Sequence, residues 1–122
     1  MDNPNNRIVW CDIPTKDLDR AIKFYSALLG EKIEKQSFPG TEFAAFVHEN
    51  GVGGCLVSHP EAHPSAQGPL VYLNCQGRLD EAAARVGLNG GTILQPKHEI
   101  GPYGFRVIIL DSEGNRIALH SR

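Results

Sequence analysis

The chain has 122 residues and a formal net charge of −2; 41% of its residues are hydrophobic and 21% are charged. This balance predicts one globular domain with a real core. It excludes the basic face that nucleic-acid binding needs, and no apolar run approaches the roughly 18 residues that cross a membrane. The N-terminal segment is too polar for a signal peptide, and three cysteines without close spacing are typical of a reducing compartment. We therefore expect a cytoplasmic protein without nucleic-acid or membrane partners.

The first half of the chain predicts a strand, a helix and three more strands. Residues 7–13 alternate in polarity before Pro14, which fits a strand that runs into a turn. Asp17 can cap the helix that follows, and Gly30 is suited to end it. Apolar residues recur at helical spacing on one face of this helix: Leu18, Ala21, Ile22, Tyr25, Leu28 and Leu29. Strands are then expected at 32–36, 41–48 and 53–58, with turns at 39–40 and 50–51.

The second half repeats this plan after a linker at 59–68, which is rich in proline and small residues. A strand is expected at 70–75, and a helix follows that the NGG sequence at 89–91 ends. The apolar face of this helix is narrower: Leu79, Ala82, Ala83 and Val86. Three more strands are expected at 92–96, 104–111 and 116–120. The turn DSEGN joins the last two.

The two halves can be laid on each other, which makes an internal repeat. DLDRAIKFYSALLG corresponds to RLDEAAARVGLNGG, and ENGVGGCLVSH corresponds to SEGNRIALHS. Each unit alone has too little sheet to close a core. We therefore predict one α+β domain over residues 1–122, in which a first βαβββ unit (about 7–59) combines with a second (about 69–121).

The whole chain resembles the vicinal oxygen chelate superfamily of glyoxalases, bleomycin-resistance proteins and extradiol dioxygenases. The segments IPTKDLDRAIKFYSALLG, LDEAAARV and IGPYGFRVIILDSEGNRIALHS carry the likeness. The last of them is similar to a bacterial subgroup labelled "predicted enzyme related to lactoylglutathione lyase". The resemblance implies paired βαβββ units whose mixed sheet curls into a cup with the helices outside. It also implies a homodimer with its ligand inside the cup.

In the metalloenzymes of that family, the resemblance implies a divalent metal held by His or Glu on the first and last strands of each unit. The motifs place Trp10 and Cys55 at these positions in the first unit. In the second unit the positions are Ala118 and either Leu70 or Val71, depending on one gap. None of these is His, Asp or Glu, and one cysteine cannot hold a labile divalent ion. We therefore expect no metal cofactor.

Strand alternation predicts which side chains line the cup. If Trp10 faces it, Asp12 does too, and His120 shares a face with Ala118. The candidate ligand-binding residues are Trp10, Cys55, Val57, Tyr72, Asn74 and Tyr103. Tyr103 belongs to GPYGF (101–105), which could be a flap over the cup or a plain turn. Apolar walls with a few polar groups are typical of small-molecule sites.

Catalysis, if the chain has any, is assigned to Asp12 and His120. A carboxylate that orients an imidazole makes a general base. Asp12 could equally bind backbone amides of the turn, and His120 could be a surface residue near the chain end. A buried, inert thiol is favoured for Cys55 over a nucleophile, because no Cys–His motif supports one. His59 and His63 precede prolines in the linker and are expected to be solvated.

The sequence favours a metal-free protein that binds a small organic molecule. One alternative is a metal-dependent lyase or isomerase related to lactoylglutathione lyase, with one divalent ion on unconventional ligands such as His120 and Cys55. The other is a structural homodimer without a ligand. Fold alone does not decide among these functions.

Overall fold

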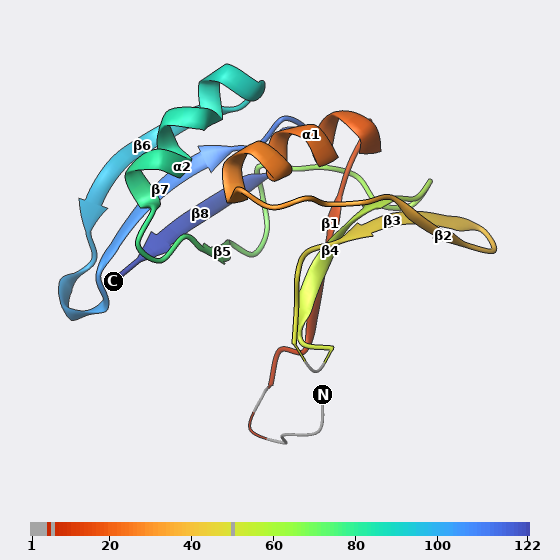
Figure 1. The fold of residues 1–122 in the computed structure, drawn as a ribbon, viewed down its shortest axis with the longest axis horizontal. Helices are drawn as coiled ribbons and strands as arrows, with labels where there is room; N and C mark the ends of the chain where they lie inside the picture. Colours follow the sequence, from red (N-terminus) through yellow and green to blue (C-terminus); the bar gives the residue numbers. More distant parts are fainter. Residues whose placement is uncertain (1–4, 6, 50) are drawn as a thin grey trace.

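The computed structural model describes residues 5, 7–49 and 51–122, which form an α+β fold of two βαβββ units (Figure 1). The first unit comprises β1 (Trp10–Pro14), α1 (Leu18–Leu29), β2 (Gln36–Phe38), β3 (Thr41–Ala45) and β4 (Gly53–Ser58). The second comprises β5 (Val71–Asn74), α2 (Leu79–Val86), β6 (Thr92–Glu99), β7 (Phe105–Leu110) and β8 (Arg116–Ser121). Two 3-10 helices, η1 (Gly87–Asn89) and η2 (Gly101–Tyr103), lie on either side of β6. Asn50 of the turn predicted at 50–51, and residues 1–4 and 6 of the polar N-terminal segment, lie outside the described residues.

The strands form two mixed four-stranded sheets with the same internal order. The first sheet has the order β1-β4-β3-β2, and the second has the order β5-β8-β7-β6. In each, the first strand of the unit pairs in parallel with the last, and the other pairs are antiparallel. The α+β class and the repeated unit are therefore confirmed. β1 and β5 are edge strands of separate sheets, so the cup is not closed by hydrogen bonds between them.

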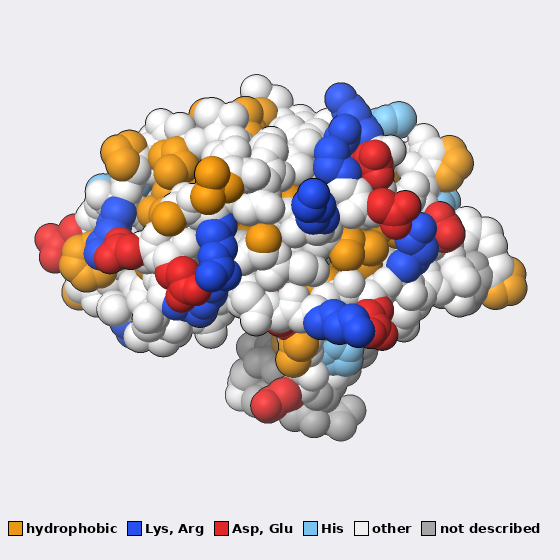
Figure 2. All heavy atoms as spheres, turned by 45° about the horizontal axis from the view of Figure 1, so that its top comes forward, with side chains coloured by type: hydrophobic (Ala, Val, Ile, Leu, Met, Phe, Trp, Pro, Cys, Tyr) orange, Lys and Arg blue, Asp and Glu red, His pale blue; other side chains and the backbone are white. Residues whose placement is uncertain are grey.

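Both helices lie on one side of the two sheets, and the opposite sides are left open (Figure 1). One apolar core joins the helices, the inner faces of both sheets and Ile33. The buried residues of α1 are Leu18, Ala21, Phe24, Tyr25 and Leu28. Phe24 is fully buried although it lies outside the predicted apolar face, so the buried stripe is wider than predicted. The face that Figure 2 shows mixes acidic and basic side chains.

The ends of α1 follow the predicted capping chemistry. The Asp17 side chain accepts a hydrogen bond from the Arg20 amide at 3.0 Å, which satisfies one of the free N–H groups of the first turn. Gly30 takes a left-handed conformation at φ 66°, and its amide donates to the Ser26 carbonyl. The helix boundaries predicted from these two residues are confirmed.

Several strands differ from the predicted boundaries. β1 begins at Trp10 instead of residue 7, and β3 ends at Ala45 instead of residue 48. Residues 32–35 are a connection, because Ile33 turns into the core, and β2 begins only at Gln36, where it can pair with β3 around the Pro39–Gly40 turn. β6 extends to Glu99 instead of residue 96, as it pairs with β7 through two register shifts. Pro96 is tolerated there because β6 is an edge strand.

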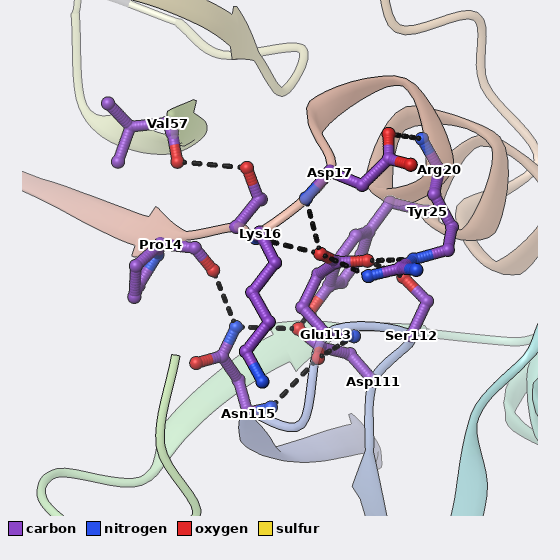
Figure 3. A network of polar contacts seen from close by, with 11 residues as sticks. Pro14, Lys16, Asp17, Arg20, Tyr25, Val57, Asp111, Ser112, Glu113 and Asn115 are labelled. Atoms are coloured by element: carbon purple, nitrogen blue, oxygen red, sulfur yellow. Dashed lines mark hydrogen bonds and ion pairs between the residues drawn. The ribbon is translucent and has the colours of Figure 1, made fainter. Parts of the chain in front are cut away.

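A buried carboxylate connects the second unit to the first (Figure 3). Glu113, in the turn between β7 and β8, accepts hydrogen bonds from the amides of Lys16 and Asp17, both at 2.8 Å. Arg20 adds an ion pair at 2.7 Å. Burial alone would raise the pKa of Glu113, but the hydrogen bonds from Arg20, Asp17, Lys16 and Ser112 together lower it from its usual value of 4.5. The charged form is therefore the one that holds the units together.

The same turn is reinforced by Asp111 and Asn115. Asp111 accepts from the amides of Glu113 and Asn115 and from the buried Tyr25 hydroxyl of α1. The Asn115 side-chain amide donates to the Pro14 carbonyl at the end of β1 at 2.8 Å. Burial, with the Asp111 carboxylate beside it, raises the pKa of Tyr25 well above its usual value, so this hydroxyl stays protonated as a donor. The turn thus contacts both β1 and α1 (Figure 3).

A second connection joins the two helices. Arg78 donates to the Leu28 carbonyl at 2.7 Å, and Arg85 donates to the Ala27 carbonyl at 2.9 Å. Cations beside the last carbonyls of a helix complement its dipole and satisfy acceptors that have no partner within the helix. The C-terminus of α1 is therefore bound by arginines of the second unit.

We expect Glu113→Gln to lower the free energy of unfolding by about 3 kcal/mol, because it leaves a buried donor set without its charged acceptor. Urea denaturation measures this. Asp80→Asn is the matched control: it removes an exposed ion pair with Lys97 and should cost less than about 0.5 kcal/mol.

The difference between wild type and Glu113→Gln should depend on pH. Because the folded-state pKa of Glu113 is lowered, its contribution is complete above the unfolded value and is lost as pH falls through the folded value. The gap should therefore be full at neutral pH and shrink below about pH 4.5. A gap that persists unchanged in strong acid would show that the charge of Glu113 contributes nothing.

Candidate functional site

The open face of the first sheet carries a small cluster around Trp10. Asp12 accepts hydrogen bonds from the Trp10 indole at 3.1 Å and from the Cys55 thiol at 3.3 Å. The His48 ring packs edge-on against the Trp10 ring, with centroids 5.3 Å apart. A Cβ at Gly53 would lie only 2.9 Å from the His48 Cβ, so a glycine there lets the histidine come close. We call Trp10, Asp12, His48 and Cys55 the first open-face cluster.

The chemistry of this cluster is set by the protonated thiol. Burial raises the pKa of Cys55 to about 11, and the neighbouring Asp12 carboxylate acts in the same direction. Asp12 thus binds a neutral thiol and an indole N–H. Cys55 is therefore a poor nucleophile near neutral pH, since that role needs the thiolate.

The open face of the second sheet carries a separate cluster around Arg106. In the sheet register, Arg106 on β7 lies opposite His98 on β6 and His120 on β8. Its Nε donates to His98 Nε2 at 2.9 Å, and its Nη1 donates to the Tyr72 hydroxyl at 2.5 Å. The rings of Tyr72 and His120 are 6.2 Å apart. We call Tyr72, His98, Arg106 and His120 the second open-face cluster.

His120 and Asp12 have separate partners in the structure. The His120 Nε2–H donates to the Tyr103 carbonyl at 2.7 Å, since a carbonyl can only accept. Asp12 is engaged by Trp10 and Cys55 on the other sheet. The backbone of the predicted flap is thus attached to His120, while the Tyr103 side chain stays 68% exposed. The role proposed for the Asp12–His120 pair stays a prediction.

A cleft of about 800 Å³ lies between the edge strands β1 and β5. Trp10, Tyr72 and Asn74, from the predicted site, line it. Its apolar lining also includes Ile8, Phe46, Val47 and Val71. Other predicted residues are placed elsewhere: Asp12 lines a smaller neighbouring pocket, and Val57 is 7% exposed within the first sheet. The cleft therefore brings together part of the predicted set.

The four positions that the resemblance predicts for metal ligands carry side chains that do not suit a metal. Trp10 pairs with Gly53, two residues before Cys55, and Val71 pairs with Ile117. Val71 is thus opposite a residue only one position before Ala118. The residue opposite the position two before Ala118 is Leu70, so Leu70 is the counterpart of Trp10. An indole, a thiol, an isobutyl group and a methyl group offer one sulfur donor, which is too few for a metal site. Among the described residues, no group of three or more His, Cys, Asp and Glu side chains could hold a metal ion.

Sequence reasoning missed Arg106, His98 and His48. Arg106 lies in a strand read only as apolar, FRVIIL, and alternation from His120 across the β7–β8 turn could have placed it on the open face. No sequence signal could have found His98, because its position opposite Arg106 depends on the register shifts of β6. His48 was included in a predicted strand that ends earlier, at Ala45.

Native Cys55 should resist alkylation. Burial raises the pKa of Cys11 and Cys75 as well, so we expect iodoacetamide at pH 7.5 to leave the folded protein unmodified. Intact mass spectrometry measures this, and the urea-unfolded chain, which should take three adducts, is the control. Rapid labelling of Cys55 in the folded protein, located by peptide mapping, would mean that its thiolate is populated.

No helix among the described residues has both the length and the apolar character needed to span a membrane.

The sequence profile of the glyoxalase/bleomycin resistance protein/dioxygenase superfamily matches residues 7–119. A search of curated protein sequences found no significant match.

Solved structures share the fold. A glyoxalase/bleomycin resistance protein from Albidiferax ferrireducens T118 is 21% identical, with a TM-score of 0.71 over 93% of this chain and 97% of that one. A glyoxalase I mutant from Zea mays is 20% identical, with a TM-score of 0.69 over 93% of this chain and 44% of that one. The fosfomycin resistance protein FosX from Listeria monocytogenes is 16% identical, with a TM-score of 0.64 over 91% and 86%. The profile match over nearly the whole length shows that this chain belongs to the glyoxalase/bleomycin resistance protein/dioxygenase superfamily.

Proposed function

We propose that this protein binds a small organic molecule in the cleft between β1 and β5, and that it does so without a metal. The cleft itself is the observation that carries the proposal. At about 800 Å³ it has the size of a small-molecule site, and its walls are mainly apolar with a few polar groups. Ile8 and Val47, 81% and 77% exposed, are large apolar side chains that a ligand would cover.

The metal-free part of the proposal is supported by the chemistry of the ligand positions. Zinc and similar ions need deprotonated thiols, imidazoles or carboxylates at fixed geometry. Cys55 offers one sulfur donor at most, its counterpart Ala118 has no donor, and Trp10 gives its N–H to Asp12. Metal-dependent lyase chemistry on His120 and Cys55 is the alternative, but in the structure His120 donates to the Tyr103 carbonyl and Cys55 donates to Asp12.

The test is titration with N-phenyl-1-naphthylamine, a neutral aromatic probe that fluoresces in apolar surroundings. We expect saturable binding that quenches the emission of Trp10, the one tryptophan of the chain. Trp10→Ala should weaken probe binding about tenfold or more, because it removes a large apolar wall. Leu88→Ala, which changes an exposed side chain outside the cleft, is the control and should bind like wild type.

A metal-free site also predicts how this titration responds to ions. Chelator should leave probe binding unchanged. Zinc, nickel or manganese should not raise the melting temperature, whereas a metal that binds only the folded state would raise it. Stoichiometric metal in the purified protein, lost on His120→Ala, would instead support the metal-dependent alternative. Failure of the probe to bind wild type would favour a structural role.

We also propose that the chain forms a homodimer in which a second copy covers part of the open sheet faces. Among the described residues, helices cover one side of each sheet, so the other side is free to pack against a second copy. Sedimentation equilibrium should give twice the chain mass of 13.3 kDa. A mass of one chain at micromolar concentration would contradict this proposal.

A further inference from the structure

We propose that the ligand is an organic anion whose charged group binds Arg106 and the Tyr72 hydroxyl at the second open-face cluster. This inference rests on the proposed function, because it names the chemical class of the molecule that the cleft binds. Arg106 is a cation that the fold holds in place without a neutralising carboxylate among the described residues.

Arg106 is held in place by two neutral groups. It is half-buried, and its Nε and Nη1 donate to His98 and Tyr72. The His98 ring must be neutral in this arrangement, since its Nδ1–H donates to the Pro96 carbonyl and its Nε2 accepts from Arg106. The guanidinium is therefore fixed over the sheet by partners that leave its charge intact. Such preorganisation lowers the entropy cost of binding.

No carboxylate pairs with Arg106 among the described residues. By contrast, Arg20, Arg78 and Arg85 each form an ion pair with a glutamate. The partners of Arg106 on the open face are imidazole and phenol groups. A partly desolvated cation without a counter-ion is unfavourable, and an incoming anion removes that cost. The electrostatics of the second open-face cluster therefore favour a negatively charged ligand group.

Two donors are available for that group. The Nη2 of Arg106 makes no hydrogen bond to any described residue, and the Tyr72 hydroxyl, which accepts from Nη1, still has its own proton to donate. Tyr72 is 48% exposed and lines the cleft. A carboxylate, sulfonate or phosphoryl group has two oxygens to accept these bonds.

The remainder of the ligand is inferred from the cleft. Its walls beyond Tyr72 are mainly apolar, and Glu31 is the one carboxylate among the described residues that line it. A second anionic group near Glu31 would be repelled. The ligand class is therefore an amphipathic organic molecule with one anionic end and an apolar body.

A pair of probes separates the charge from the apolar body. 1-Anilinonaphthalene-8-sulfonate has the same aromatic skeleton as N-phenyl-1-naphthylamine and adds one sulfonate. We expect Arg106→Gln to weaken binding of the sulfonate about tenfold or more, as loss of a hydrogen bond to a charged group does. Binding of the neutral probe should change less than twofold. Arg122→Gln removes the same charge from an exposed position outside the cleft, and it should affect neither probe.

Tyr72→Phe is the second variant, and it keeps the ring that lines the cleft. It should weaken the sulfonate several-fold and leave the neutral probe unchanged, so the inference stays testable if Arg106→Gln unfolds. Equal losses for both probes in these variants would overturn the anion site. An equal effect of Arg122→Gln would overturn it as well, because net charge alone would then explain the result. If neither probe binds wild type, the binding function itself fails, and this inference fails with it.

Discussion

The buried carboxylate of Glu113 fixes how the two units sit together. A core packs without directional preference, and two similar units could pack in several ways. Glu113 removes that freedom, because its side chain is buried and two of its donors are backbone amides of the loop between β1 and α1. The Asn115 contact to the Pro14 carbonyl then fixes the end of β1. The cleft has β1 as one wall, so its shape depends on a turn outside it.

The turn before the last strand makes different contacts in the two units. The turn before the last strand of the second unit contacts the first unit through Asp111, Glu113 and Asn115. The corresponding turn of the first unit pairs Glu49 with Val52, and the preceding residue, His48, packs on Trp10. One copy of the turn thus joins the two units, and the other packs against Trp10. This asymmetry follows from side chains, since the strand order of the two sheets is the same.

The sequence predicted the features that depend on local or repeated patterns. The cap at Asp17, the left-handed Gly30 and the order of elements all followed from spacing and turn chemistry. What it could not predict depends on contacts between distant segments. Ile33 was predicted to lie in a strand, but its side chain is buried in the core. Its amide donates to the Ser26 hydroxyl of α1, which holds the connection after the helix against the core. For the site, alternation placed Trp10 beside Asp12 but could not show which groups they would bind.

The second open-face cluster depends on a backbone irregularity that no side-chain pattern predicts. Ile93 pairs with Ile109, and a strand continued at this register would bring Pro96 opposite Arg106. Two register shifts, between Ile93 and Gln95 and between Gln95 and His98, each advance β6 by one residue. One shift alone would send the next side chain to the opposite face, whereas two restore the face and replace proline with histidine. Arg106 therefore gains a neutral acceptor for its Nε, and its Nη1 contacts Tyr72, which lines the cleft.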